Sequence, residues 1–164
     1  MADARVKAYA AAAAVFALDR LTKRLIETRL TFLDTHRVIP GFFDIVRWEN
    51  RGVAFGLFND STWQWRTALL ALAALGAVAV VSVLLWKAPR LDRLSIGGFA
   101  LILGGAAGNL FDRLVSGQVT DFLLFHIGEY QWPAFNVADS AVVVGSGLLV
   151  LHMLRPKAQA ANVP

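Results

Sequence analysis

Long apolar runs separated by short charged segments fill the second half of the chain, and they predict membrane-spanning helices. Residues 67–86 form a run of 20 without a charge, and residues 94–111 form a second run of 18. Residues 137–154 carry a single carboxylate, Asp139, near their start. About 20 mostly apolar residues are needed to cross the hydrocarbon core of a bilayer. We therefore expect three spans in these ranges.

The first apolar segment is less regular. Residues 8–18 are apolar, but Asp19, Arg20 and Lys23 follow at once. A cleaved signal peptide is one explanation, because basic residues precede a short apolar core. However, apolar positions continue beyond this point without a clear small-residue cleavage site. We therefore expect an uncleaved span over about 8–26, whose outer end holds charge.

The segment over about 27–66 has a different pattern. Its apolar and aromatic runs are short (38–39, 42–46 and 53–55), and prolines and glycines separate them. This pattern is typical of short strands with tight turns. Trp63 and Trp65 suit an interfacial piece, because tryptophan favours the headgroup region. Residues 116–136 are expected to form a loop.

These elements predict the fold class. The chain is expected to be a mainly α membrane protein, forming one integral membrane domain over residues 1–164. It would be a four-transmembrane-helix bundle with a small outward-facing β-rich cradle and an interfacial segment. The composition agrees, with 57% hydrophobic residues and a mean hydropathy of +0.54, which is high for a soluble domain. There is no internal repeat.

Cysteine and histidine usage narrows the chemistry. The chain has no cysteine, which excludes a thiol nucleophile, thiolate metal ligands and disulfides. Its three histidines show no metal-ligand spacing. We therefore expect neither a metal nor another cofactor.

The positions of the basic residues predict the orientation. The two tails and the loop between the second and third spans carry seven basic residues against two acids. The segment from 27 to 66 has five arginines balanced by five acids. The positive-inside rule then places both termini in the cytoplasm and the 27–66 and 116–136 segments outside. Because topology accounts for the basic residues, no nucleic-acid partner is expected.

Two carboxylates, Asp121 and Asp139, stand out against the apolar background. Each borders an apolar run, and a carboxylate near the middle of a bilayer costs about 2.5 kcal/mol or more on insertion scales. A helix cap and a loop aspartate would explain the two residues separately. Together with the other polar groups, they are interpreted as an aspartic dyad.

Other polar and small residues accompany the two acids in the third span. Asn109 is three residues before Asp112 and four before Arg113, so all three can share a helix face. Arg113 has several possible roles: pairing with Asp112, holding the anionic member of the dyad, meeting lipid phosphate, or simply extending to the interface. Gly104 and Gly108 would let helices approach closely, which packing alone can explain.

Local spacing suggests further roles for the charged residues. Asp19 and Lys23 are four apart and can form an ion pair. Asn136 is three before Asp139, the spacing of a capping box, and the helix dipole there favours an ionised carboxylate. Asp121 lies beside an apolar run, where desolvation favours the protonated form. We therefore predict that Asp139 acts as base and Asp121 as acid.

Five sequence blocks together resemble the lipoprotein signal peptidases (signal peptidase II), which are four-span aspartic proteases of the bacterial inner membrane. The resemblance covers nearly the whole chain. The blocks are residues 19–23 (DRLTK), 50–56 (NRGVAFG), 104–113 (GGAAGNLFDR), 119–122 (VTDF) and 135–140 (FNVADS).

The resemblance implies a function and a set of site residues. Asp121 and Asp139 would be the catalytic pair, cutting diacylglyceryl-modified prolipoproteins just before the lipid-modified cysteine. The enzyme would act as a monomer among membrane phospholipids, with its site near the periplasmic face. Phe55 would belong to a mobile flap or anchor the chain in the membrane. Supporting or substrate-binding positions would be Asp19, Lys23, Asn50, Gly52, Phe55, Gly104, Gly108, Asn109, Asp112, Arg113, Asn136 and Ala138.

Two other functions fit parts of the pattern. A serine protease would use Ser146, but this residue lies toward the cytoplasmic half of the last span, away from Lys23. A small proton- or ion-conducting protein would also contain intramembrane acids. Such relays usually distribute charge through the membrane depth, whereas these acids gather near one face.

Overall fold

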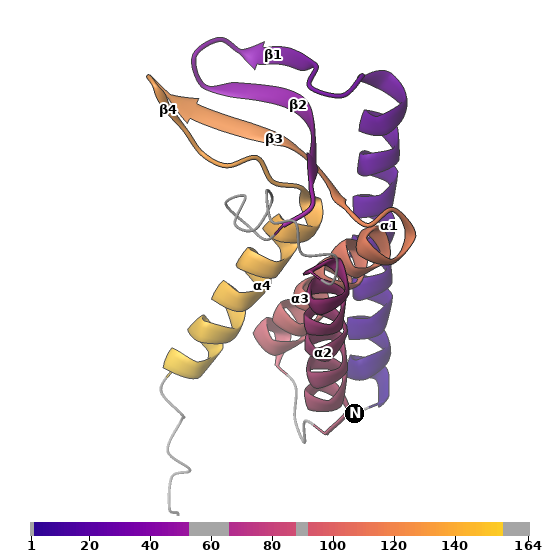
Figure 1. Ribbon diagram of the computed structural model, residues 1–164. Helices are drawn as coiled ribbons and strands as arrows, with labels where there is room; N and C mark the ends of the chain where they lie inside the picture. Colours follow the sequence, from indigo (N-terminus) through magenta and orange to yellow (C-terminus); the bar gives the residue numbers. More distant parts are fainter. Residues whose placement is uncertain (1, 53–65, 88–91, 156–164) are drawn as a thin grey trace, which may run out of the picture.

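The structure is a computed structural model that describes residues 2–52, 66–87 and 92–155. The small sheet lies across one end of the helices, beside the C-terminal end of α1 (Figure 1). The helices cover the four segments for which the sequence predicts helices. The predicted interfacial tryptophans and Phe55 lie outside the described residues. The helices are α1 (Ala2–Arg29), α2 (Arg66–Lys87), α3 (Arg93–Val115) and α4 (Val137–Leu154).

Helix α3 is the central helix and packs against the other three. Small residues form its contacts with α1 and α4. A methyl group at Gly104 would lie 2.5 Å from the carbonyl oxygen of Ala12 on α1. On the α4 side, a methyl group at Gly105 would collide with the carbonyl oxygen of Ala138. Small residues thus bring the backbones of three helices close together, as is common between membrane helices.

Three of the described helices are long and apolar enough to cross a membrane: Thr67–Lys87, Arg93–Val115 and Val137–Leu154. Helix α1 has 28 residues, or about 42 Å at 1.5 Å per residue, which exceeds the hydrocarbon thickness. Because α1 carries several charged residues, it is not among the helices that are apolar enough to cross a membrane by composition. The count of four spans therefore stays a prediction.

Among the described residues, the sheet has four antiparallel strands in the order β1-β2-β3-β4. The expectation of a loop over 116–136 was wrong, because β3 forms there and pairs with β2. Their register places Trp48 opposite Asp121 and Asn50 opposite Val119. In β3, Val119, Phe122 and Leu124 are buried. The strands are β1 (Thr35–Ile39), β2 (Phe43–Asn50), β3 (Val119–Ile127) and β4 (Tyr130–Gln131).

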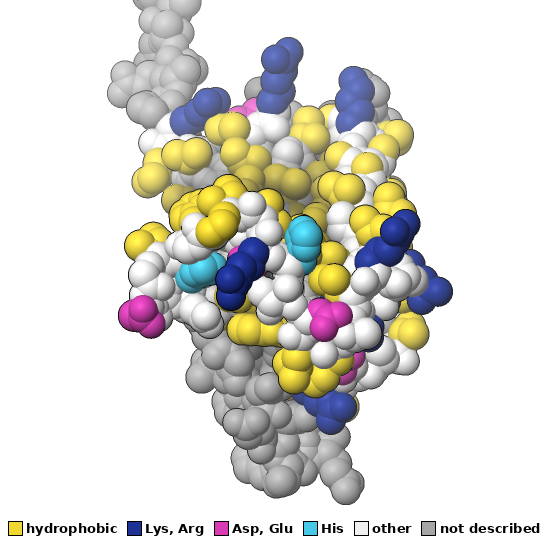
Figure 2. Space-filling model, turned by 90° about the horizontal axis from the view of Figure 1, so that it is seen from above, with side chains coloured by type: hydrophobic (Ala, Val, Ile, Leu, Met, Phe, Trp, Pro, Cys, Tyr) yellow, Lys and Arg dark blue, Asp and Glu magenta, His cyan; other side chains and the backbone are white. Residues whose placement is uncertain are grey.

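Side chains tie the sheet to the end of α1. The Arg47 guanidinium on β2 donates to the carbonyl oxygens of Glu27 (3.0 Å) and Leu30 (2.9 Å), near the C-terminal end of α1. The Thr120 hydroxyl on β3 donates to the Glu27 carboxylate at 2.9 Å. Seen from above, the sheet end presents basic and histidine side chains set among hydrophobic ones (Figure 2). The sheet is therefore fixed to the bundle beside the residues of the site.

Candidate active site

Asp121 is held on β3 by two amide side chains. The Asn50 amide on β2 donates to one carboxylate oxygen at 3.0 Å, and the Asn136 amide donates to the other at 2.7 Å. Only 4% of Asp121 is exposed. This burial raises the pKa of Asp121 to about 7; the negative charge of Asp139 adds to the effect, and the two amide donors oppose it. Asp121 can therefore hold a proton near neutral pH.

Asp139 lies in the first turn of α4, where the predicted capping box is confirmed. The Asp139 backbone N–H donates to Asn136 Oδ1 at 2.9 Å, and the Asn136 N–H donates to the Asp139 carboxylate at 3.3 Å. The Asn109 amide on α3 donates to the other carboxylate oxygen at 2.8 Å. A carboxylate in this position interacts favourably with the helix dipole.

Asn136 connects the two acids. Its side-chain amide binds Asp121, while its backbone N–H and side-chain oxygen bind Asp139. The residue is fully buried, so these bonds do not compete with water. One asparagine therefore fixes the position of β3 against the start of α4.

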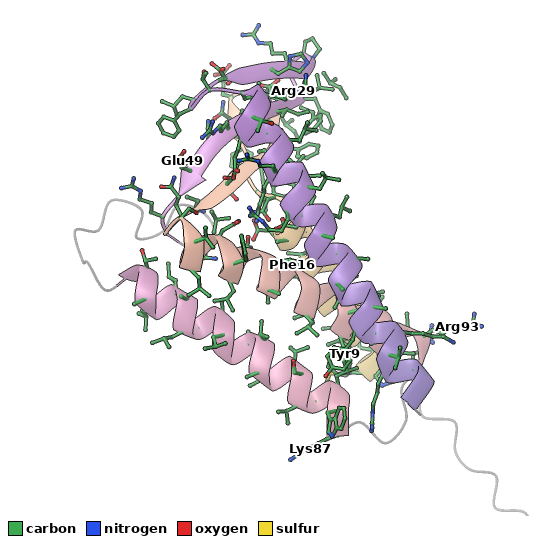
Figure 3. The ribbon with its side chains drawn as sticks, turned by 90° about the vertical axis from the view of Figure 1, so that its right-hand side faces the viewer. Tyr9, Phe16, Arg29, Glu49, Lys87 and Arg93 are labelled. Atoms are coloured by element: carbon green, nitrogen blue, oxygen red, sulfur yellow. The ribbon has the colours of Figure 1, made fainter. Side chains whose placement is uncertain are left out.

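A buried lysine lies behind this layer. Lys23 Nζ is 2.8 Å from the Asp19 carboxylate, 2.6 Å from the Asp112 carboxylate and 2.9 Å from Asn109 Oδ1. Lys23 and Asp19 are both fully buried. Because Lys23 donates to the side-chain oxygen of Asn109, the side-chain nitrogen of Asn109 is directed at Asp139. Polar side chains gather where α1, α3 and the sheet meet, between Phe16 and Glu49 in Figure 3.

Asp19 also holds the start of α4. Its second carboxylate oxygen accepts a hydrogen bond of 3.0 Å from the Ala138 backbone N–H. Gly108 makes room for this carboxylate, because a methyl group there would collide with Asp19 Oδ2. The small residues at Gly104 and Gly108 thus have different neighbours, the α1 backbone and a carboxylate.

Asp112 and Arg113 face different surroundings. Asp112 turns toward α1, where it pairs with Arg20 and Lys23. The Arg113 guanidinium donates to the carbonyl oxygens of Asn109 (3.1 Å) and Gly52 (3.2 Å). It therefore lies on the side of α3 that carries Asn109, and the sequence-based option of an Asp112–Arg113 pair is replaced by these contacts.

Both acids line one large cavity of about 590 Å³. Its polar wall consists of Asp121, Asp139, Asn50, Asn109 and Arg113. Its remaining wall is almost entirely apolar and comes from α2, α3, α4 and the segment before α4. We call it the large cavity; the rest of its lining is Leu70, Ala73, Ala74, Ala106, Val119, Trp132, Pro133, Ala134, Phe135, Ser140, Val142, Val143 and Val144.

The structure brings together nearly all the site residues proposed from the sequence. Two groups can be told apart. The layer behind the acids consists of Asp19, Lys23, Gly108, Asp112 and Ala138. At the cavity or beside it lie Asn50, Gly52, Asn109, Arg113 and Asn136. Gly104 lies farther along α3 and contributes packing only. Phe55 lies outside the described residues. Within the described part of the chain, no cluster of histidine and acidic side chains could hold a metal ion.

Sequence reasoning missed Arg20 and Thr120. Arg20 pairs with Asp112, and Thr120 binds Glu27. Both residues adjoin a residue that the sequence had singled out, Asp19 or Asp121. Their partners lie more than 90 residues away in the chain, so only the packing of α1 against α3 and β3 reveals them.

One buried and one partly buried carboxylate share the wall of an apolar cavity in a bundle of long apolar helices. This is the arrangement expected of a membrane aspartic peptidase. Comparison with known proteins gives the same class. A model of the family described as "Signal peptidase (SPase) II" matches residues 11–155. This chain belongs to the signal peptidase II family, a family of aspartic proteases.

Individual relatives agree with this assignment. The chain is 61% identical to the lipoprotein signal peptidase of Solibacter usitatus over 99% of both chains. It is 43% identical to that of Oleidesulfovibrio alaskensis, over 91% of this chain and 95% of the relative. A solved bacterial membrane enzyme superposes with a TM-score of 0.81 at 25% identity, covering 96% of this chain and 93% of that one.

Proposed function

We propose that this protein cuts the signal peptide from diacylglyceryl-modified prolipoproteins, just before the lipid-modified cysteine, using water activated by Asp121 and Asp139. The observation that carries the proposal is the meeting of these two acids on the wall of a cavity lined by apolar helices. An enzyme that cuts a lipid-modified peptide needs an apolar space for the lipid and hydrolytic groups beside that space. The relatives named lipoprotein signal peptidase support the same substrate class.

The surroundings of the two acids support a division of labour between them. Ionised Asp139 accepts a proton from the attacking water, while protonated Asp121 donates a hydrogen bond to the scissile carbonyl oxygen. The pKa of Asp121, about 7, suits the second role. Asn50, Asn109 and Asn136 are positioning residues, because their hydrogen bonds fix the acids. Arg113, on the same cavity wall, is available to stabilise developing negative charge.

The same proposal includes a membrane arrangement. The enzyme would be a monomer in the bacterial inner membrane, with α1 as a fourth span and the sheet on the periplasmic side. The charges that make α1 polar support this, since Asp19 and Lys23 are buried in the bundle rather than facing lipid. The acyl chains of the substrate already confine it to the bilayer, at about 0.8 kcal/mol for each buried CH₂. Capture then requires only lateral diffusion into the large cavity.

The test is cleavage of a purified diacylglyceryl-modified prolipoprotein by the detergent-solubilised protein. Wild type should cut, and Asp121→Asn and Asp139→Asn should each lose cutting, because either change leaves only one ionisable carboxyl in the pair. Ser146→Ala is the matched control, since Ser146 lies on α4 away from the acids' cavity lining. An inert wild type, or normal cutting by both folded variants, would contradict the proposal; liposome flux assays would then test ion conduction.

A further inference from the structure

Asp121 is bordered by a second cavity as well as by the large one. This small cavity has a volume of about 250 Å³, less than half that of the large cavity. The two cavities share four residues: Asn50, Asp121, Pro133 and Ala134. The boundary between them therefore runs past a proposed catalytic acid. The other residues of the small cavity are Phe32, Leu33, Trp48 and Glu49.

The walls of the two cavities come from different parts of the fold. Helices α2, α3 and α4 supply most of the large cavity, whereas the turn after α1 and strand β2 supply most of the small one. Glu49 marks this position at the sheet end in Figure 3. A chain that passes from one cavity to the other would leave the helix bundle and reach the sheet beside Asp121.

A strained residue forms part of the small cavity's wall. Leu33 has a φ of 69°, a left-handed conformation that is uncommon for any residue other than glycine or asparagine. Its N–H donates to the Arg47 carbonyl at 3.0 Å, and the Arg47 N–H donates to the Asp34 carbonyl at 3.2 Å. Backbone strain of this kind persists where the surrounding structure enforces it, often at binding sites. The hydrogen bonds show that this wall is a defined part of the fold.

The small cavity also carries a charge. Glu49 places a carboxylate in its lining, and the nearest cation among the described ion pairs is Arg47, at 3.4 Å. The Arg47 guanidinium donates two shorter bonds to the carbonyl oxygens at the end of α1. Glu49 is therefore able to attract a positive side chain and repel a negative one.

We propose that the small cavity binds the substrate residue that directly follows the modified cysteine, and that Glu49 selects against an acidic side chain there. This inference rests on the proposed function. The signal peptide and the acyl chains both belong in the bilayer, so they fit the large cavity between the helices. The mature chain is the only part of the substrate that must leave the membrane. The small cavity lies on its route, across Asp121 and toward the sheet.

The test compares two diacylglyceryl-modified prolipoproteins that differ only in the residue directly after the cysteine, lysine or glutamate. Wild type should show a kcat/KM about fivefold higher for the lysine substrate, the effect of a partly exposed ion pair. Glu49→Gln should bring the ratio close to one, and Glu49→Lys should invert it. Glu129→Gln and Glu129→Lys, at an exposed position in the turn between β3 and β4, should keep the wild-type ratio.

A second variant tests the shape of the small cavity without using charge. Leu33→Gly keeps a residue that tolerates the left-handed conformation and removes the side chain. It should raise kcat/KM for a substrate with phenylalanine after the cysteine relative to one with glycine. Unchanged ratios in both the Glu49 and the Leu33 variants, with all substrates cut, would overturn this inference alone. A wild type that cuts no substrate would overturn the proposed function and this inference with it.

Discussion

Lys23 and Asp121 are both buried ionisable residues, yet their surroundings give them different tasks. Lys23 has close partners on Asp19, Asp112 and Asn109 and no exposed surface. Asp121 accepts hydrogen bonds from two neutral amides and borders two cavities. The first arrangement holds a charge in one fixed place, whereas the second leaves a carboxyl available to a substrate.

Replacing Lys23 should therefore damage both stability and catalysis. Lys23→Met leaves the Asp19 carboxylate without its cation, and removing one partner from a buried ion pair typically costs about 3–5 kcal/mol. It also removes the 2.9 Å hydrogen bond from Lys23 to the Asn109 side-chain oxygen. That oxygen keeps only the longer bond of 3.3 Å from the Asn136 amide, so Asn109 is held less firmly toward Asp139. Thermal unfolding in detergent and the kcat of prolipoprotein cleavage measure the two effects.

A double variant separates these effects. Asp19→Asn combined with Lys23→Met removes the unpaired charge, while the new amide oxygen can still accept the Ala138 N–H. Stability should recover in part, but kcat should stay low because Asn109 still lacks the hydrogen bond from Lys23. Full recovery of kcat would show that Lys23 only stabilises the fold.

The pKa of Asp121 predicts a pH dependence. Because burial raises this pKa to about 7, the protonated carboxyl should be lost as pH rises through about 7. The kcat for cleavage should then fall on the alkaline side with a midpoint near 7. A rate that stays flat up to pH 9 would show that the reaction does not need this proton.

The same raised pKa affects stability, with a defined sign. An aspartate has an unfolded pKa of about 3.9, so between about pH 4 and 7 the folded protein binds a proton that the unfolded chain has released. The contribution of Asp121 to stability is therefore complete below about pH 4 and declines as pH rises through about 7. Asp121→Asn should lack this decline, which melting temperatures of both proteins across this range would measure.

The sequence predicted those elements that depend on neighbouring residues, but it missed those that depend on partners far away in the chain. The apolar runs predicted the helices because a charge-free stretch is a property of neighbouring residues. Strand β3 was missed because its register depends on β2, with Asn50 and Asp121 separated by 71 positions. The Asn136–Asp139 capping box was predicted correctly because its two residues are three apart. The partners of Asp112 lie on α1, so spacing within α3 could not identify them.

The close approach of α1 to α3 gives a prediction at this scale. Gly104→Ala places a methyl group 2.5 Å from the Ala12 carbonyl oxygen and 2.7 Å from Val15 Cβ. Since backbone cannot move aside cheaply, we expect a loss of about 1–3 kcal/mol. A lower melting temperature would be the readout. The α1 contacts with Asp112 and Asn109 should loosen as well, lowering activity.

Gly147→Ala on α4 is the control for this substitution, because no atom lies within 4 Å of the added methyl group. Alanine favours a helix over glycine by up to about 1 kcal/mol, so this variant should be as stable as wild type or slightly more so. Equal effects of both substitutions would mean that α1 and α3 are not in close contact.

For the molecule as a whole, the end that carries the sheet is opposite to the start of α1 and the last turn of α4 (Figure 1). The proposed orientation places the sheet in the periplasm. Because the chain has no cysteine, single cysteines can report accessibility without background. Glu129→Cys should react with a membrane-impermeant thiol reagent in intact spheroplasts. Lys87→Cys, at the far end of α2, should react only after permeabilisation; the reverse result would invert the topology.

The bond between the Asp19 carboxylate and the Ala138 backbone N–H joins the first helix to the last one. The ribosome synthesises α1 first and α4 near the end of the chain, and β2, α3 and β3 are made between them. The acids consequently have no complete set of partners until α4 has entered the bilayer. We therefore expect a nascent chain to be inactive while it is being inserted, and a chain truncated before α4 to stay inactive.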